Sequence, residues 1–161
     1  MADVETIVEP EVSLHMDATF FPVLCVTWFG VISPTTVTGY MNWLDRMATR
    51  AAEEGTRVSI LGDITGLESR PGPEIRRSMA KAIDELATRH GRTLMGGVTI
   101  IADPFMRAIL SMVVAISRRE FELKPVRTFA QAVERTFALL DAEGIARPEG
   151  LEQRTRPERP Q

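Results

Sequence analysis

The chain has 161 residues, which is the size of one ordinary domain that can bury a core. Its composition, 44% hydrophobic and 25% charged, is typical of a soluble globular protein. The formal net charge of −3 argues against a nucleic-acid partner, which usually requires a basic surface. A single cysteine, Cys25, excludes a disulfide framework, and no apolar signal segment opens the sequence. We therefore expect a cytoplasmic protein with no integral membrane association.

The first part of the chain predicts a short antiparallel edge. Residues 1–11 are acidic and are expected to form a flexible segment. From Val12 to Met16, apolar and polar residues alternate, which indicates a half-buried edge strand. Residues 21–30 are apolar almost throughout, so they predict a strand that is covered on both faces.

The rest of the domain alternates between helices and strands. Ser33 followed by Pro34 marks a helix start, and Thr128 with Gln131 forms a capping-box pattern before the last helix. The expected helices span residues 34–54, 73–90, 104–119 and 129–143, and the expected strands span 57–64, 96–102 and 124–129.

This order predicts an α/β fold with a mostly parallel sheet of four or five strands. An antiparallel N-terminal edge and four covering helices complete the expected architecture. The central strands should be buried at Val23, Cys25, Val26, Ile60, Leu61, Val98, Ile100 and Ile101. Residues 145–161 have no apolar period and mix both charges, so we expect a disordered tail after a domain that spans 12–144.

A strand–turn–strand opening and three later stretches resemble the STAS domain, in particular its SpoIIAA-like branch, often grouped with SEC14-type folds. The three stretches are ILGDITGLE at 60–68, VTIIADPFMRAILSMV at 98–113 and VRTFAQAVERTFALL at 126–140. The likeness runs from Val12 to Leu140 and rests on the order of the motifs. It implies a regulatory module that binds a protein partner without catalysis, as anti-sigma-factor antagonists of that family do.

One departure from that family concerns phosphorylation. Its anti-sigma-factor antagonists carry an Asp–Ser–Ser/Thr–Gly motif in which a serine receives a phosphate. Here residues 68–74 read ESRPGPE, without the pair of hydroxyl residues. Ser69 is the first candidate for phosphorylation by position and Thr65 the second, but the resemblance does not by itself imply a phosphoswitch.

Polar residues follow two neighbouring strands, where functional groups gather in parallel α/β sheets. The expected partner-binding set is Asp63, Thr65, Ser69, Arg70, Arg76, Arg77, Asp103 and Arg107. The alternative is purely structural: Asp103 caps its helix, Asp63 caps the turn, and the arginines are solvated. No third acid or histidine joins the two aspartates at ligand spacing, and no nucleotide-binding loop is present. We expect no metal, no cofactor and no enzymatic activity.

The segment that follows Asp103 is apolar nearly all round. Its expected dimer or apolar surface consists of Phe105, Met106, Ile109, Met112, Val113 and Ile116. A helix on a sheet buries one side only, so the other side needs a second copy of the chain, its own N-terminal segment or an apolar ligand. A homodimer is the first expectation. Two functions therefore stay open: a regulatory adaptor that binds a protein partner through the 63–77 loop and this apolar helix, and a small SEC14-like carrier of an apolar or lipid-like ligand.

Overall fold

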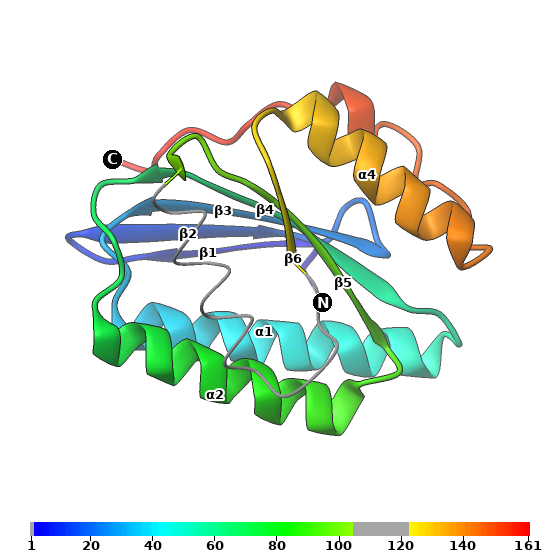
Figure 1. Cartoon of the computed structure of the whole chain (residues 1–161), viewed down its shortest axis with the longest axis horizontal. Helices are drawn as coiled ribbons and strands as arrows, with labels where there is room; N and C mark the ends of the chain where they lie inside the picture. The colour runs from blue at the N-terminus through cyan, green and yellow to red at the C-terminus, as the bar shows by residue number, and fades with distance from the viewer. Residues whose placement is uncertain (1, 105–122) are drawn as a thin grey trace.

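The computed structural model describes residues 2–104 and 123–161, which form a mixed sheet packed between layers of helix and extended chain (Figure 1). The six strands of these residues lie in the sheet in chain order, and neighbours are hydrogen-bonded. β1 and β2 pair antiparallel, as do β2 and β3, whereas β3 to β6 are parallel. The strands are β1 (Val4–Val8), β2 (Val12–Asp17), β3 (Val23–Gly30), β4 (Val58–Leu67), β5 (Leu94–Ile100) and β6 (Leu123–Val126).

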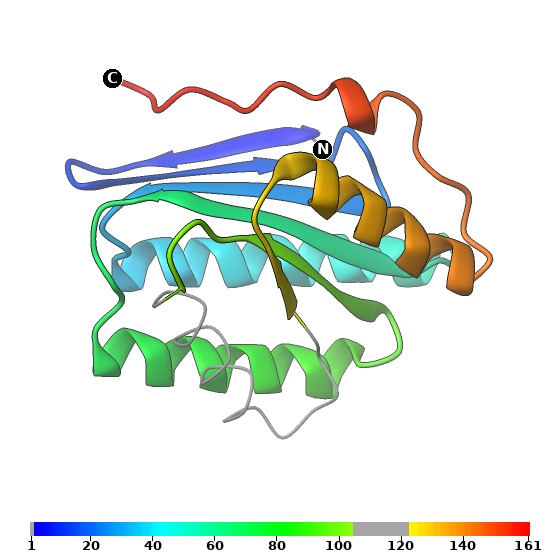
Figure 2. The ribbon, with the colours of Figure 1, turned by 45° about the horizontal axis from the view of Figure 1, so that its top comes forward.

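The two faces of the sheet are covered differently. Helices α1 (Pro34–Glu53) and α2 (Pro73–His90) lie side by side on one face, which we call the α1–α2 face (Figures 1 and 2). Helix α4 (Phe129–Ala142) and the tail, residues 145–161, lie on the opposite face, which we call the tail face. The tail includes a single 3-10 turn, η1 (Leu151–Gln153).

The predicted α/β class, the parallel centre and the antiparallel N-terminal strands are confirmed. Local signals set the helix starts: Ser33 caps α1 in a capping box with Thr36, and the Thr128 hydroxyl accepts a hydrogen bond from the Gln131 N–H at 3.2 Å. All eight predicted central-strand residues are buried. The helix predicted at 104–119 lies outside the described residues from position 105 onward.

Two expectations about the sheet and the chain ends differ from the structure. The sheet has six strands rather than four or five, because residues 4–8, expected to be flexible, pair with β2 as an outer strand. The strand from Val12 is therefore the second strand and not the edge. The tail, expected to be disordered, follows the sheet, and its Leu151 is fully buried.

The period of two along each strand separates two apolar clusters. Leu24, Val26 and Trp28 point to the α1–α2 face. There the centres of the Trp28 and Tyr40 rings lie 5.4 Å apart in an edge-on arrangement. Val23 and Cys25 point to the tail face and pack in a second cluster with α4 and Leu151. This alternation decides which face each residue of the candidate site occupies.

Candidate functional site

Strand β4 continues to Leu67, whereas the predicted strand spans residues 57–64. Thr27 of β3 pairs with Asp63, and Phe29 pairs with Gly66, so β4 holds one extra residue between these pairs. This is a β-bulge, which leaves a residue outside the hydrogen-bond ladder. Asp63 compensates, since its Oδ1 accepts from the Thr65 N–H at 2.9 Å and from the Thr65 hydroxyl at 2.6 Å.

Gly66 makes the continuation of β4 sterically feasible. A Cβ at this position would lie 2.6 Å from the Phe29 ring and 2.6 Å from the Trp28 carbonyl oxygen. Because such distances are closer than real Cβ atoms approach other atoms, a side chain at residue 66 would push β4 away from β3. The glycine therefore keeps the bulge, and with it Asp63, against β3.

The tail crosses the sheet as an extended strap on its tail face (Figure 2). Gly150, with φ at +81°, turns the chain into η1, and Leu151 enters the apolar cluster beneath α4. Beyond η1, three arginines of the tail each pair with an acid from the first half of the chain. The pairs are Arg154 with Asp17, Arg156 with Asp63, and Arg159 with Glu68.

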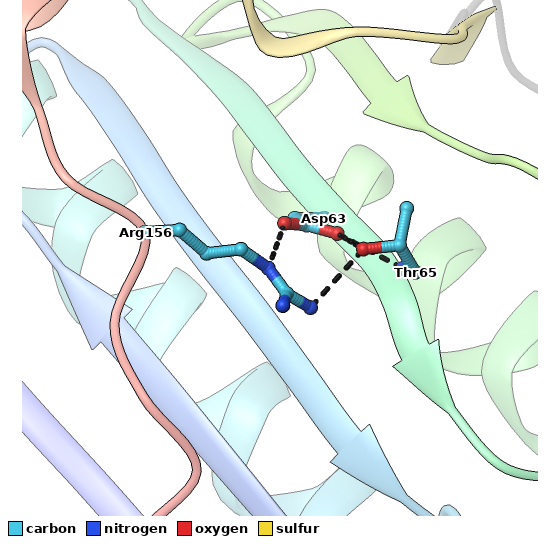
Figure 3. Close-up of polar contacts among 3 residues, drawn as sticks. All are labelled: Asp63, Thr65 and Arg156. Atoms are coloured by element: carbon cyan, nitrogen blue, oxygen red, sulfur yellow. Dashed lines mark hydrogen bonds and ion pairs between the residues drawn. The ribbon is translucent and has the colours of Figure 1, made fainter.

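Asp63 is the centre of the Arg156 contact (Figure 3). The Arg156 Nε donates to Asp63 Oδ2 at 2.7 Å, and its Nη2 donates to the Thr65 hydroxyl at 3.1 Å. The guanidinium also lies 5.0 Å from the centre of the Phe29 ring. Asp63 is buried, and both of its carboxylate oxygens are hydrogen-bonded within the chain.

The Asp17–Arg154 pair is more deeply buried. The side chain of Arg154 is 7% exposed and that of Asp17 is 10% exposed, with 3.2 Å between Nε and Oδ2. Burial alone would raise the pKa of Asp17, but hydrogen bonds from Thr19 and Arg154 outweigh it and lower that pKa. Asp17 is therefore held as a carboxylate beneath the tail.

A row of polar residues crosses the tail face beside these pairs. His15 on β2 faces Thr27 on β3, which in turn faces Asp63 on β4. Burial, followed by the nearby Arg154 charge, lowers the pKa of His15 although Asp17 opposes this. Burial raises the pKa of the Cys25 thiol to about 12, which makes it unreactive at neutral pH.

The structure divides the predicted partner-binding set between the two faces of the sheet. Asp63 and Thr65 lie on the tail face with Arg156. Arg76 is half-buried and lines an apolar cavity on the α1–α2 face, so it is on the other side of the sheet from Asp63. Arg76 belongs to α2, which covers the α1–α2 face. Successive residues of a strand face opposite sides of the sheet, so Gly62 faces the same cavity as Arg76 and Asp63 faces the tail side.

The remaining described members of the set are exposed. Ser69 and Arg70 lie between β4 and α2, Arg77 lies in the first turns of α2, and Asp103 follows β5. Arg107 lies outside the described residues, as do all six members of the expected dimer or apolar surface, which begins at Phe105.

Sequence reasoning predicted Asp63 and Thr65 but missed the arginines of the tail that contact this face. Arg154 and Arg156 are two residues apart in an extended segment, a spacing that puts both side chains on one side of the chain. This spacing was a usable signal that the two arginines contact the same surface. Their acidic partners, Asp17 and Asp63, are distant in sequence and could not be assigned from spacing.

Chemically, the tail face offers paired charges and buried hydrogen-bond donors. Across the described part of the chain, no three His, Cys, Asp or Glu side chains gather in a way that would hold a metal ion. No helix in the described ranges combines the length and apolar character needed to cross a membrane. No protein-family model and no curated protein matches this chain in sequence.

Proposed function

We propose that the chain is a non-catalytic regulatory or adaptor module that binds a protein partner through the segment from Glu68 to Arg77. We call this segment the docking segment. The observation that carries the proposal is its exposure: Glu68, Ser69, Arg70 and Arg77 are all exposed between a buried strand and a half-buried helix. The STAS-like, SpoIIAA-like identity of the fold is part of the same proposal and rests on the sequence resemblance.

The frame of the docking segment favours recognition. At its start, the Glu68 N–H donates to the Gly30 carbonyl at 2.9 Å, and the Glu68 carboxylate pairs with Arg159 of the tail. Pro71 and Pro73 restrict the backbone between β4 and α2. A surface segment with a restricted backbone loses less conformational entropy when it binds a partner.

The charge of the docking segment indicates an acidic partner surface. Arginines at 70, 76 and 77 outnumber the acids at 68 and 74. The first N–H groups of α2 point toward Gly72, the residue before the helix. Gly72 makes no side-chain cap hydrogen bond to them. A partner carboxylate near α2 would find both a positive helix end and arginine side chains.

We propose constitutive docking rather than a phosphoswitch. Ser69 is exposed, but the pair of hydroxyl residues typical of the family's phosphorylation motif is absent. Ser69→Ala and Ser69→Asp should therefore capture the partner equally.

A carrier of apolar ligands is less well supported. An apolar cavity does lie between the sheet and helices α1 and α2, lined by residues such as Trp28, Leu44, Met79 and Ile83. Its volume is about 100 Å³. Pockets for drug-sized ligands have roughly 300 Å³ or more. The size favours a nearly filled core.

The test is affinity capture of the tagged full chain from its native cells, with proteins and lipids identified by mass spectrometry. Arg70→Glu combined with Arg77→Glu should abolish partner capture, because both charges at the exposed segment are reversed. The matched control is Arg92→Glu with Arg135→Glu, which makes the same charge change at exposed positions elsewhere.

The control should retain the partner. Equal capture by both double variants would refute the docking segment. Release by Ser69→Asp alone would show a phosphoswitch, and an apolar ligand in place of a protein would favour the carrier.

A further inference from the structure

The two outer strands of the described sheet, β1 and β6, differ in how they are protected against pairing with another strand. β6 contains Lys124 and Pro125, and lysine and proline are residues that natural proteins use to block an edge strand. β1, with the sequence VETIV, contains neither of them. It is therefore the edge at which a further strand can be added.

The backbone groups of β1 point alternately toward β2 and away from the sheet. At one end of this strand pair, the Glu9 N–H donates to the Val12 carbonyl at 2.8 Å. At the other end, the Ala18 N–H donates to the Asp3 carbonyl at 2.6 Å. Because bonded and non-bonded pairs alternate along an antiparallel ladder, every second residue between these ends turns its N–H and C=O outward. The residues with outward backbone groups are Val4, Thr6 and Val8.

The side chains of the same three residues are exposed. Val4 and Val8 are 44% and 56% exposed, the highest values among the large apolar side chains of the described residues. Thr6 lies between them and is also exposed. Val4 pairs with Asp17, whose side chain contacts the tail, so the three side chains lie on the tail side of β1. Unpaired backbone groups and apolar side chains thus coincide on one strand, which is the pattern of an edge that adds a strand.

The sequence of β1 is complementary to a second copy of itself. In an antiparallel pair centred on Thr6, Val4 lies opposite Val8 of the second copy, and Thr6 lies opposite Thr6 of the second copy. Each pair of outward residues then exchanges two hydrogen bonds. The valine pairs cover exposed apolar surface, and a Thr–Thr pair is favourable across strands. Glu5 lies opposite Ile7 of the second copy, so no like charges oppose each other within the strand.

This register is favoured over its neighbours. A pair centred on Glu5 would oppose two carboxylates and would join fewer residues. In the register centred on Thr6, the acids Asp3 and Glu9 come next to each other just beyond the strand. Their charges are compensated within each copy, since Asp3 lies 3.8 Å from Arg50. The Glu9 carboxylate accepts a hydrogen bond from the Ser33 hydroxyl at 2.9 Å.

We propose that two copies of the chain associate through β1, so that their sheets join into one continuous sheet about a two-fold axis. The interface involves five residues of each copy, so it is small, and the association should depend strongly on concentration. It is separate from the docking segment, and from the apolar surface expected to begin at Phe105. The proposed function and this dimer can therefore fail independently of each other.

The first measurement is sedimentation velocity of the full chain over about a hundredfold range of concentration. The wild type should change from one copy to two as the concentration rises. Thr6→Pro should remain a monomer, because it removes an outward N–H that makes no bond to β2. Thr6→Val keeps that N–H and suits a strand, so it is the matched control and should dimerise as the wild type does. Circular dichroism checks that each variant is folded.

A second pair of variants tests the side chains and decides the matter if Thr6→Pro fails to fold. Val4→Lys combined with Val8→Lys places lysines opposite each other in the paired strands, so the double variant should be a folded monomer. Val31→Lys makes the same replacement at an apolar side chain that is 37% exposed and lies outside β1. This control should dimerise.

Cysteine cross-linking tests the register. The native Cys25 is 0% exposed and does not compete. In the proposed pair the two copies of residue 6 have Cα atoms about 5.5 Å apart, within the range of a disulfide, so Thr6→Cys should form a covalent dimer under mild oxidation. The two copies of residue 4 are separated by four residues along the strands, roughly 14 Å, so Val4→Cys should form none.

Three results would overturn the proposal. The first is a wild-type chain that stays monomeric at every concentration. The second is a dimer that persists in both Thr6→Pro and the double lysine variant, because it would use another surface. The third is cross-linking of Val4→Cys as efficient as that of Thr6→Cys, which is incompatible with an antiparallel pair centred on Thr6.

Discussion

The two faces of the sheet bury similar strands by different means. On the α1–α2 face, two helices of 20 and 18 residues cover an apolar surface that includes Leu24, Val26 and Trp28. On the tail face, α4 covers the apolar part around Leu61 and Val98. The extended tail covers the rest, where Asp17, Thr27 and Asp63 lie.

The difference teaches what each kind of cover requires. A helix places a continuous apolar stripe on a sheet, and the hydrophobic effect needs no particular pairing of residues. An extended segment presents fewer apolar side chains, so here its position depends on Leu151, the half-buried Ile145 and directed arginine–carboxylate contacts. Because a buried ion pair regains little more than its desolvation cost, the tail contacts favour one position of the tail more than they add to stability.

Matched leucines give the largest test of this comparison. Leu24 faces α1 and Leu151 lies in the tail, and both have 0% exposure. Leu24→Ala should lower the free energy of unfolding by about 2–5 kcal/mol. Leu151→Ala should cost less, since the single turn of η1 can move into the cavity that the truncation leaves. Denaturant unfolding measures both free energies. A larger loss in Leu151→Ala than in Leu24→Ala would show that the tail stabilises the fold more than the helix cover does.

Two acids of the tail contacts provide the intermediate test. Asp17→Asn leaves the buried Arg154 without its carboxylate and should lower the free energy of unfolding by about 1–3 kcal/mol. Glu68→Gln removes an acid whose side chain is 57% exposed, and its effect should be within about 1 kcal/mol.

Acid provides the control for that pair. Because the pKa of Asp17 is lowered, its stabilisation is complete above the ordinary value of 3.8 and is lost as the pH falls through the lowered pKa. The difference between wild type and Asp17→Asn should therefore shrink in strong acid. A difference that stays constant with pH would show that the carboxylate charge is not what stabilises the tail.

Histidine titration gives the smallest test. The pKa of His15 is lowered by burial and by Arg154, so the folded chain takes up a proton less readily than the unfolded chain. Stability should therefore fall as the pH drops below the ordinary value of 6.5. His15→Gln should lose less stability than the wild type between about pH 8 and about pH 5.5. A His15→Gln variant whose stability falls with pH as steeply as that of the wild type would contradict this prediction.

Local signals explain what could be predicted from the sequence. Ser33 with Pro34, and Thr128 with Gln131, define helix starts through contacts within one turn, and the structure confirms both. The buried strands were equally clear because their apolar runs are local. These features need no knowledge of what lies opposite them in the fold.

What escaped prediction depends on distant partners. Residues 4–8 have only an imperfect alternation, and they form a strand because β2 provides a hydrogen-bond partner. The continuation of β4 beyond Asp63 was not predicted. It depends on a bulge that is fixed by the fit of Gly66 against Phe29, which lies on another strand. The roles of Arg154 and Arg156 are decided by acids that lie 137 and 93 residues earlier in the chain.

These separations also bear on the order of events during folding. A contact between residues far apart in sequence requires closure of a long loop, so it tends to form after local contacts. Synthesis proceeds from the N-terminus, so Asp17 and Asp63 leave the ribosome long before the arginines that cover them. We therefore expect their carboxylates to remain hydrated while β2, β3 and β4 assemble on α1 and α2. We expect the tail to dock last, onto a sheet that has already formed, so that its charges meet only in the final step.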